Sequence, residues 1–188
     1  MNKKLSEKVF FSLWVTDFDY ISTRHLLAGS LFPSAASLAN IAMERYIKTY
    51  LWSLGRDDLV MKIKKWGGNE SHNTPRIIEL CEKEINISPG LNKKEGKILK
   101  DIYTCYCFRY IDVMYARRDM CQILKNYMYT IDKVCCFYRE KIQLILPHQG
   151  NTLIDVLLEN NPDKMAALNT GNVNLREVLL HDNQFLKA

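Results

Sequence analysis

The chain of 188 residues is 47% hydrophobic and 25% charged, and it contains only 8 glycines and 5 prolines. This composition is typical of one helix-rich globular domain that is long enough to bury a real core. No alternating β pattern recurs, no apolar run is long enough to span a bilayer, and no small-residue cleavage site follows the basic start. We therefore expect an all-α protein of the cytoplasm with no membrane association.

The formal net charge of +5 is modest, and it matters only where basic residues gather on one side. Such a surface would attract a phosphate-bearing partner, whereas lysines spread over exposed helix faces serve solvation alone, which is the more common case. The basic residues that would form this surface are Lys3, Lys4, Lys62, Lys64, Lys65, Lys93, Lys94, Lys97, Lys100, Arg117 and Arg118.

The cysteines and the common motifs exclude several classes of site. No CxxC pair is present, and almost all of the cysteines lie in predicted helices, so we expect reduced thiols packed in the core of an intracellular protein and no zinc site. The chain has no phosphate loop, dinucleotide fingerprint, HExxH or GxSxG, so we expect no cofactor or metal. The six cysteines are Cys81, Cys105, Cys107, Cys121, Cys135 and Cys136.

Helical periodicity, caps and breakers divide the chain into predicted helices. In the first helix, Thr16 and Asp17 mark a capping signal and a break. Ser34 is the expected N-cap of the second helix, and Gly55 is its stop. The predicted helices cover residues 8–28, 34–54, 57–66, 74–84, 93–115 and 118–146.

The second predicted helix has small residues on its buried side. Ala35, Ala39 and Ala42 share one arc with Tyr46, which predicts close packing against neighbouring helices. The opposite arc is polar and carries Ser37, Asn40, Glu44 and Lys48. We expect Glu44 and Lys48, spaced i,i+4, to form an exposed pair.

Two units follow from this pattern. Residues 1–146 are predicted to form an antiparallel, up-and-down bundle of four or five helices, and residues 147–188 a C-terminal extension with short amphipathic helices near 153–158 and 175–180. The apolar residues of the extension need somewhere to bury, either on the bundle or on a partner subunit.

The order of these segments resembles that of HEPN domains, which are helical bundles associated with nucleotides and RNA. The likeness covers roughly residues 9–146: residues 17–28 resemble the first helix of the family, Ala42 to Lys48 (AMERYIK) the second, His72 to Leu80 (HNTPRIIEL) its loop histidine and short helix, and Arg109-Tyr110 its arginine-bearing segment. The resemblance implies an all-α bundle, a homodimer, and RNA or a nucleotide as ligand.

Arg109 is the leading candidate for a functional side chain. Projection of its helix places it between Ile102, Tyr106 and Val113 on the apolar stripe, where a guanidinium needs a partner. That partner is either an internal carboxylate or backbone carbonyl, or a ligand anion in a cleft; the arginine that the resemblance implies supports the second alternative.

In the nuclease members of the family, four to six residues separate this arginine from a histidine, and this chain has no histidine at the corresponding positions. Tyr115 occupies one of these positions and is expected either to pack or to hydrogen-bond a phosphate. Arg117 and Arg118 offer a second basic site at the turn into the last helix, where Asp119 is expected to cap the helix. The expected nucleotide- or RNA-binding residues are therefore Arg109, Tyr115, Arg117 and Arg118, and no catalytic residue is assigned.

Three hypotheses for function follow. The first is a non-catalytic or degenerate HEPN-type domain that binds RNA, a nucleotide or a partner protein, as part of a toxin-antitoxin or defence-like system. The second is a metal-independent ribonuclease in which a displaced residue, His72 or Tyr115, replaces the missing histidine. The third is a structural companion of a nucleotidyltransferase. For His72 alone, a structural role in the loop is the simpler interpretation.

Overall fold

The computed structural model describes residues 3–107, 125–146, 152–159, 161, 168 and 173–186. These residues are helical with short connections and contain no β-strand, so the all-α class is confirmed. The elements are α1 (Lys3–Ala28), α2 (Phe32–Ser53), α3 (Asp57–Lys64), the 3₁₀ helix η1 (Gly68–His72), α4 (Thr74–Ile85), α5 (Lys93–Cys107), the 3₁₀ helix η2 (Lys125–Tyr127), α7 (Met128–Ile145), α8 (Leu153–Glu159) and α10 (Leu175–Leu180).

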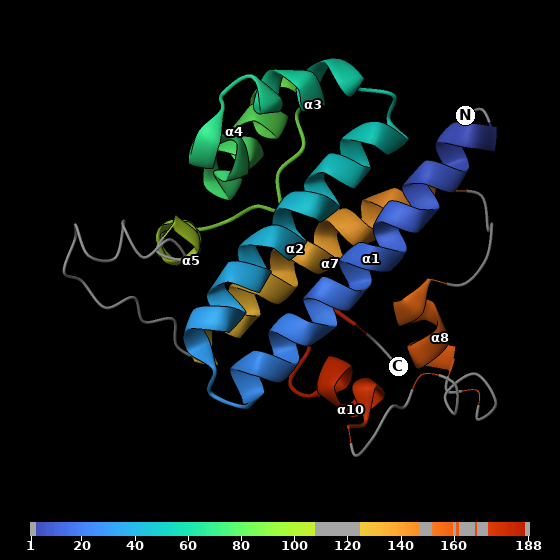
Figure 1. Ribbon diagram of the computed structural model, residues 1–188, viewed down its shortest axis with the longest axis vertical. Helices are drawn as coiled ribbons and strands as arrows, with labels where there is room; N and C mark the ends of the chain where they lie inside the picture. Colours follow the sequence, from blue (N-terminus) through green and yellow to red (C-terminus); the bar gives the residue numbers. More distant parts are fainter. Residues whose placement is uncertain are drawn as a thin grey trace.

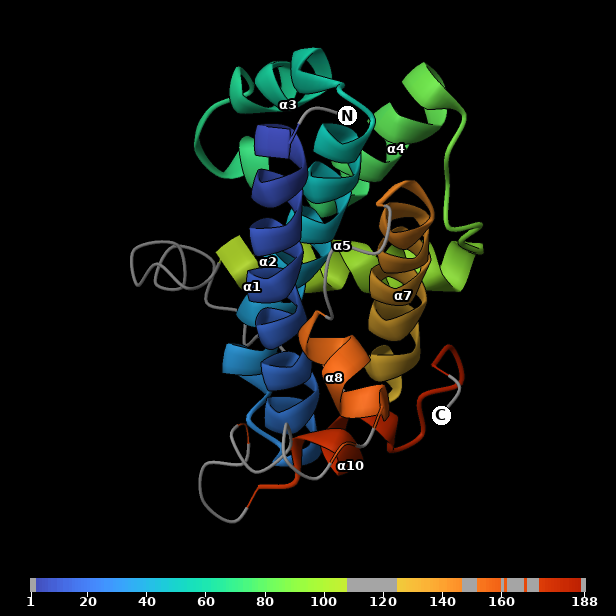
Figure 2. The ribbon, with the colours of Figure 1, turned by 90° about the vertical axis from the view of Figure 1, so that its right-hand side faces the viewer.

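Three long helices lie side by side along the molecule, and a fourth crosses them. α2 runs antiparallel to α1, and α7 packs beside both (Figures 1 and 2). α5 lies across this layer (Figure 2). The face of α5 that carries Ile98, Leu99 and Ile102 is buried against α2 and its neighbours. The bundle therefore consists of a three-helix layer crossed by α5, with α3, η1 and α4 at one end.

The helix boundaries differ from the sequence prediction at two places. α1 continues through Thr16 and Asp17, because the Thr16 hydroxyl donates to the carbonyl of Ser12 inside the helix, 2.6 Å away, and does not cap a new helix. α2 begins at Phe32 with Leu31 at its N-cap position, so Ser34 lies within the first turn.

The other ends agree with the prediction or fall outside the described residues. Gly55 adopts a φ of +70° after the end of α2, as its role as a stop requires. Within α4, the side chain of Asn73 caps the helix by accepting from the amide of Arg76 at 3.2 Å. The predicted helices 93–115 and 118–146 are described only as far as Cys107 and from residue 125.

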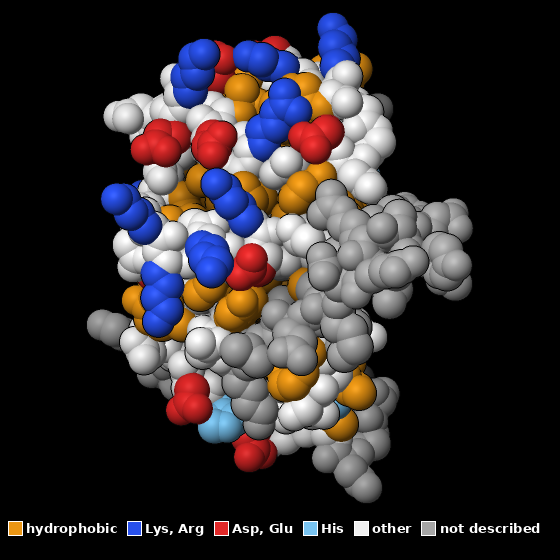
Figure 3. Space-filling model, turned by 90° about the vertical axis from the view of Figure 1, so that its left-hand side faces the viewer, with side chains coloured by type: hydrophobic (Ala, Val, Ile, Leu, Met, Phe, Trp, Pro, Cys, Tyr) orange, Lys and Arg blue, Asp and Glu red, His pale blue; other side chains and the backbone are white. Residues whose placement is uncertain are grey.

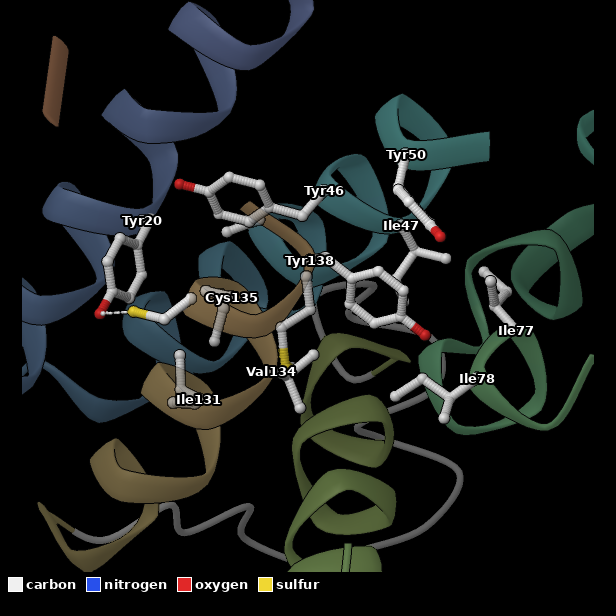
Figure 4. Close-up of a cluster of buried hydrophobic side chains, with 14 of the residues drawn as sticks. Tyr20, Tyr46, Ile47, Tyr50, Ile77, Ile78, Ile131, Val134, Cys135 and Tyr138 are labelled. Carbon is white, nitrogen blue, oxygen red and sulfur yellow. Dashed lines mark hydrogen bonds between the residues drawn. The ribbon is translucent and has the colours of Figure 1, made fainter. Parts of the chain in front are cut away.

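The alanine face of α2 is the centre of the core, as predicted. Ala35, Ala36, Ala39 and Ala42 are all 0% exposed, which allows α1 to approach the α2 backbone closely. Figure 4 shows the tyrosines that fill the space around this face, with Tyr20 from α1, Tyr46 and Tyr50 from α2, and Tyr138 from α7 directed into the same cluster; Ile77 and Ile78 come from α4.

The C-terminal extension packs on α1 of its own chain. α8 and α10 lie against α1 on the side away from α3 (Figure 2), and Leu153, Ile154, Leu157 and Leu179 are each 0% exposed. The apolar residues of the extension therefore bury on the bundle, which decides between the two alternatives that the sequence left open. No helix of the described residues is long and apolar enough to cross a membrane.

One cysteine differs from the expectation of reduced thiols. Cys81, Cys135 and Cys136 are unoxidised thiols buried in the core, as expected. Cys105 is disulfide-bonded. A position within a helix does not by itself exclude a disulfide. The cysteine pattern therefore does not support a fully reduced protein.

Candidate functional site: a histidine, a lysine and two tyrosines around Glu44

The polar arc of α2 is covered, which corrects the expectation that Glu44 lies in an exposed pair. Glu44 is only 7% exposed and Asn40 is 0% exposed, because η1 and the start of α4 pack over this face. The pair with Lys48 is present, as predicted, but it is shielded from solvent. Burial of a carboxylate is unfavourable unless cations or hydrogen-bond donors surround it, so the neighbours of Glu44 define this site.

Glu44 binds two basic side chains. One carboxylate oxygen accepts from Nζ of Lys48, and the other lies 2.9 Å from Nδ1 of His72. Lys48 also lies 3.3 Å from the carbonyl of Ser71. The loop backbone is fixed in turn, because the amide of Asn40 donates to the carbonyl of His72 at 2.9 Å. These bonds hold one lysine and one histidine in a fixed position at the surface of α2.

Two tyrosines of α5 complete the site. The ring of His72 lies 5.5 Å from the ring of Tyr106, and Tyr106 is stacked on Tyr103 at 6.5 Å between ring centroids. The Tyr103 hydroxyl donates to the carbonyl of Asn69 at 3.1 Å. Partial burial, followed by the nearby Cys107 and Glu70, raises the pKa of Tyr103, so its hydroxyl stays a hydrogen-bond donor. We call Glu44, Lys48, His72, Tyr103 and Tyr106 the His72 cluster.

The His72 ring is oriented for chemistry at its second nitrogen. A carboxylate is an acceptor, so Nδ1 donates to Glu44, and Nε2 is then the basic nitrogen of the neutral ring. Nε2 bonds no residue that the structure describes, and the side chain is 37% exposed. A histidine in this arrangement can accept a hydrogen bond or a proton from a ligand, or donate to a phosphate oxygen when it is protonated.

The residues that the sequence predicted for the site lie outside the described residues. These are Arg109, Tyr115, Arg117 and Arg118. α5 is described as far as Cys107, two residues before Arg109, and its last turn carries Tyr103 and Tyr106 of the His72 cluster.

A second polar cluster lies between α1, α7 and α10 and is fully buried. The guanidinium of Arg24, 1% exposed, bonds the carboxylate of Asp132 and the carbonyls of Val178 and His181. The hydroxyl of Tyr20 donates to the other oxygen of Asp132 at 2.7 Å. Each partner is internal, so this cluster joins the ends of the chain and offers no group to a ligand. We call it the Arg24 cluster.

Arg139 of α7 forms a similar internal link to α8. It bonds Asp155 at 2.7 Å and lies 3.4 Å from Asp17 of α1. Burial alone would raise the pKa of Asp155, but the charge of Arg139 and hydrogen bonds from Arg139 and Thr152 outweigh it and lower that pKa below its ordinary value. For Asp17, which is completely buried, desolvation is the largest effect and raises the pKa. These groups hold α8 on the bundle.

A pocket of about 540 Å³ opens next to the Arg24 cluster, between the end of α1, the start of α7 and α10. Its lining includes the apolar residues Leu27 and Val178 and the polar residues His25 and Glu177. The nitrogens of Arg24 that border it already bond Asp132 and two carbonyls. The pocket therefore presents no unpaired buried charge for a ligand.

The remaining histidines and the acidic residues form no metal site in the described part of the chain, where no group of three or more His, Cys, Asp or Glu could hold an ion. His25 is exposed on α1, and His181 lies 3.4 Å from Asp182 with its side chain 70% exposed. His148 lies outside the described residues.

Sequence reasoning missed Asn40, Lys48 and the burial of Glu44. A signal was present, because Asn40, Glu44 and Lys48 follow one another at four-residue spacing and so share one side of a helix. Such a stripe, on a helix whose other side is already buried through alanines and tyrosines, indicates a second packing partner. Arg24 and Arg139 were also missed, although each is a cation among apolar residues at helical spacing.

No family model matches this chain, and neither a curated protein nor a solved structure matches it.

Proposed function

We propose that this protein is a HEPN-like helical domain that binds a phosphate group of RNA or of a nucleotide at the His72 cluster. The observation that supports this proposal is the pair of basic side chains, Lys48 and His72, which one buried carboxylate holds beside two tyrosine rings. Cations supply the contacts to phosphate, and the partly exposed ring of Tyr103 supplies stacking for a base, while Tyr106, 1% exposed, packs behind it.

Arg109 extends this site in the proposal. Arg109 lies outside the described residues, and its place in the proposal rests on the sequence, where helical spacing puts it on the same apolar stripe as Tyr106. A guanidinium there would bind phosphate through two parallel hydrogen bonds, which a lysine cannot do. The proposed site thus combines a planar cation with Lys48 and the ring of His72.

Binding of labelled single-stranded RNA and of a labelled nucleotide, followed by fluorescence anisotropy, tests the proposal. We expect Arg109→Ala to abolish binding of both. His72→Ala is expected to weaken binding at least tenfold, which is the size of one hydrogen bond to a charged group. The matched controls, Arg56→Ala and His25→Ala, change a partly exposed arginine and an exposed histidine elsewhere and should bind normally. Unchanged binding in both Arg109→Ala and His72→Ala would refute the proposal.

One observation also favours the ribonuclease hypothesis. The 2.9 Å contact between Glu44 and Nδ1 of His72 leaves Nε2 as a base, the role that the missing family histidine would otherwise have. Incubation of the protein with RNA in a chelator distinguishes the two functions. Products that His72→Ala and Glu44→Gln both abolish, even at RNA concentrations that saturate each variant, would assign cleavage to this pair; intact RNA with the wild type would leave binding as the function.

The remaining parts of the hypothesis stay predictions. They are a homodimer, a nucleotidyltransferase partner, a toxin-antitoxin or defence-like context, and a cytoplasmic location. The mass of the purified protein in solution tests the first, and co-purification with the product of a neighbouring reading frame tests the second.

A further inference from the structure

The solvent side of α5 carries a row of lysines. Lys93, Lys97 and Lys100 follow each other at i, i+4 and i+7, so they lie on one side of the helix, and all three are exposed. We call them the α5 lysine row. The opposite side is buried at Ile98 and Ile102, which fixes the direction in which the row faces.

The lysine row is not neutralised by carboxylates. Within the described residues, none of its three lysines forms a salt bridge, whereas Lys62 and Lys133 each pair with a glutamate. The two carboxylates of α5 have other partners, because Glu95 accepts from Lys133 at 2.9 Å and Asp101 accepts from the hydroxyl of Tyr127 at 2.9 Å. The row therefore keeps its positive charge for an external anion.

The lysine row leads to the His72 cluster. Lys100 and Tyr103 are three residues apart and are neighbours on the helix surface; Tyr103 then stacks on Tyr106, which contacts His72. Figure 3 shows Lys and Arg side chains over the upper and middle parts of one face of the molecule, with Asp and Glu side chains among them. The row spans about 10 Å at 1.5 Å per residue, which about three nucleotides of a stacked strand cover.

We propose that the α5 lysine row and the His72 cluster form one continuous binding site for single-stranded RNA, with successive phosphates on the lysines and a base at Tyr103. This inference rests on the proposed function and specifies its ligand, because a mononucleotide would leave the row unused. Stacking on a tyrosine requires an unpaired base, which favours a single strand over a duplex. A lipid surface is disfavoured, since no large exposed hydrophobic residue of the described chain lies on α5.

Salt dependence of binding tests the inference with two variants of equal charge. Lys97→Gln/Lys100→Gln removes two lysines of the row, and Lys8→Gln/Lys141→Gln removes two from α1 and α7. Anisotropy of a labelled single-stranded RNA of about ten nucleotides gives the slope of log affinity against log salt. We expect the row variant to have a slope shallower by about 1.4, from about 0.7 for each phosphate contact, and the control variant to retain the wild-type slope.

A labelled mononucleotide separates this inference from the proposed function. We expect it to bind both variants and the wild type equally, since it reaches only the His72 cluster. If RNA binds the two double variants with the same slope, or if the wild type binds RNA no more tightly than the mononucleotide, the lysine row is not part of the site and the inference fails while the proposed function stands. If neither ligand binds the wild type, both fail.

Discussion

The Arg24 cluster and the His72 cluster both pair a buried charge with an opposite one, but only the His72 cluster has a partly exposed side chain that a ligand could reach. In the first, a guanidinium at 1% exposure has a carboxylate and two carbonyls as partners, and every partner is internal. In the second, a carboxylate at 7% exposure holds a lysine and a histidine whose ring is 37% exposed and keeps one nitrogen for solvent or a ligand.

The donors and acceptors of the Arg24 cluster bond groups of the protein, whereas Nε2 of His72 bonds no described residue. A buried charge with only internal partners contributes to the fold, and removal of one partner leaves the other unpaired in a dry environment. In the His72 cluster, the buried carboxylate of Glu44 orients the partly exposed ring of His72. Catalytic and metal-binding histidines are oriented by a buried carboxylate in the same way. We therefore expect mutations in the Arg24 cluster to change stability, and mutations in the His72 cluster to change binding.

The largest expected effect is on the Arg24 cluster. Arg24→Met leaves Asp132 buried without its cation and should lower the free energy of unfolding by about 3–5 kcal/mol in chemical denaturation. Arg45→Met, which removes an exposed pair with Asp19, should cost less than about 1 kcal/mol. If Arg24→Met does not fold, the double variant Arg24→Met/Asp132→Leu should recover much of the loss; equal effects of the Arg24 and Arg45 variants would contradict the assignment.

The second prediction is that a substitution of His72 changes RNA binding more than stability. His72→Ala should change the free energy of unfolding by less than about 1 kcal/mol, because its ring is partly exposed and Glu44 keeps Lys48 as a partner. The same variant should weaken RNA binding at least tenfold, about 1.4 kcal/mol or more. A large loss of stability with normal binding would place His72 with the structural cluster.

The third prediction uses pH to examine the link between α7 and α8. The pKa of Asp155 is lowered by Arg139, so its contribution to stability is present above the ordinary aspartate value of about 3.9 and is lost as pH falls through the lowered pKa. The stability difference between wild type and Asp155→Asn should therefore be largest near neutral pH and should shrink below about pH 4. A difference that stays constant down to pH 3 would show that the charge of Asp155 does not contribute.

The smallest expected effect is at an exposed ion pair. Lys62 and Glu84 are 2.7 Å apart on the surface of α3 and α4, and Lys62 has a 51% exposed side chain. Solvent screens such a pair, so Lys62→Ala should leave the denaturation midpoint unchanged within error. A clear loss of stability there would weaken the distinction between exposed and buried pairs on which the comparison depends.

The sequence predicted most of the helices because their signals are local. The alanine arc of α2 and Gly55 are periodicity and backbone effects that involve neighbouring residues only. The burial of Glu44 depends instead on η1, which is distant in sequence and covers the polar arc of α2. The proximity of the α5 lysine row to the His72 cluster likewise depends on α5 crossing α2. The periodicity of a sequence does not give the angle at which two helices cross.

The same limit applies to the charged core. Arg24 and Asp132 are 108 residues apart, and nothing local to either residue indicates the other. A cation inside an apolar stripe did signal that a partner exists, and this reasoning was applied to Arg109, which lies outside the described residues. Arg24 and Arg139 satisfy the same criterion, and in both cases the partner is an internal carboxylate.

Arg24 ties the beginning of this chain to its end. Arg24 of α1 donates to the backbone carbonyls of Val178 and His181, so the pairing of its guanidinium depends on a segment 154 and 157 residues later in the sequence. During synthesis this guanidinium would stay solvated until α10 had emerged. Deletion of residues 177–188 would remove both carbonyl partners and should therefore destabilise α1 near Arg24.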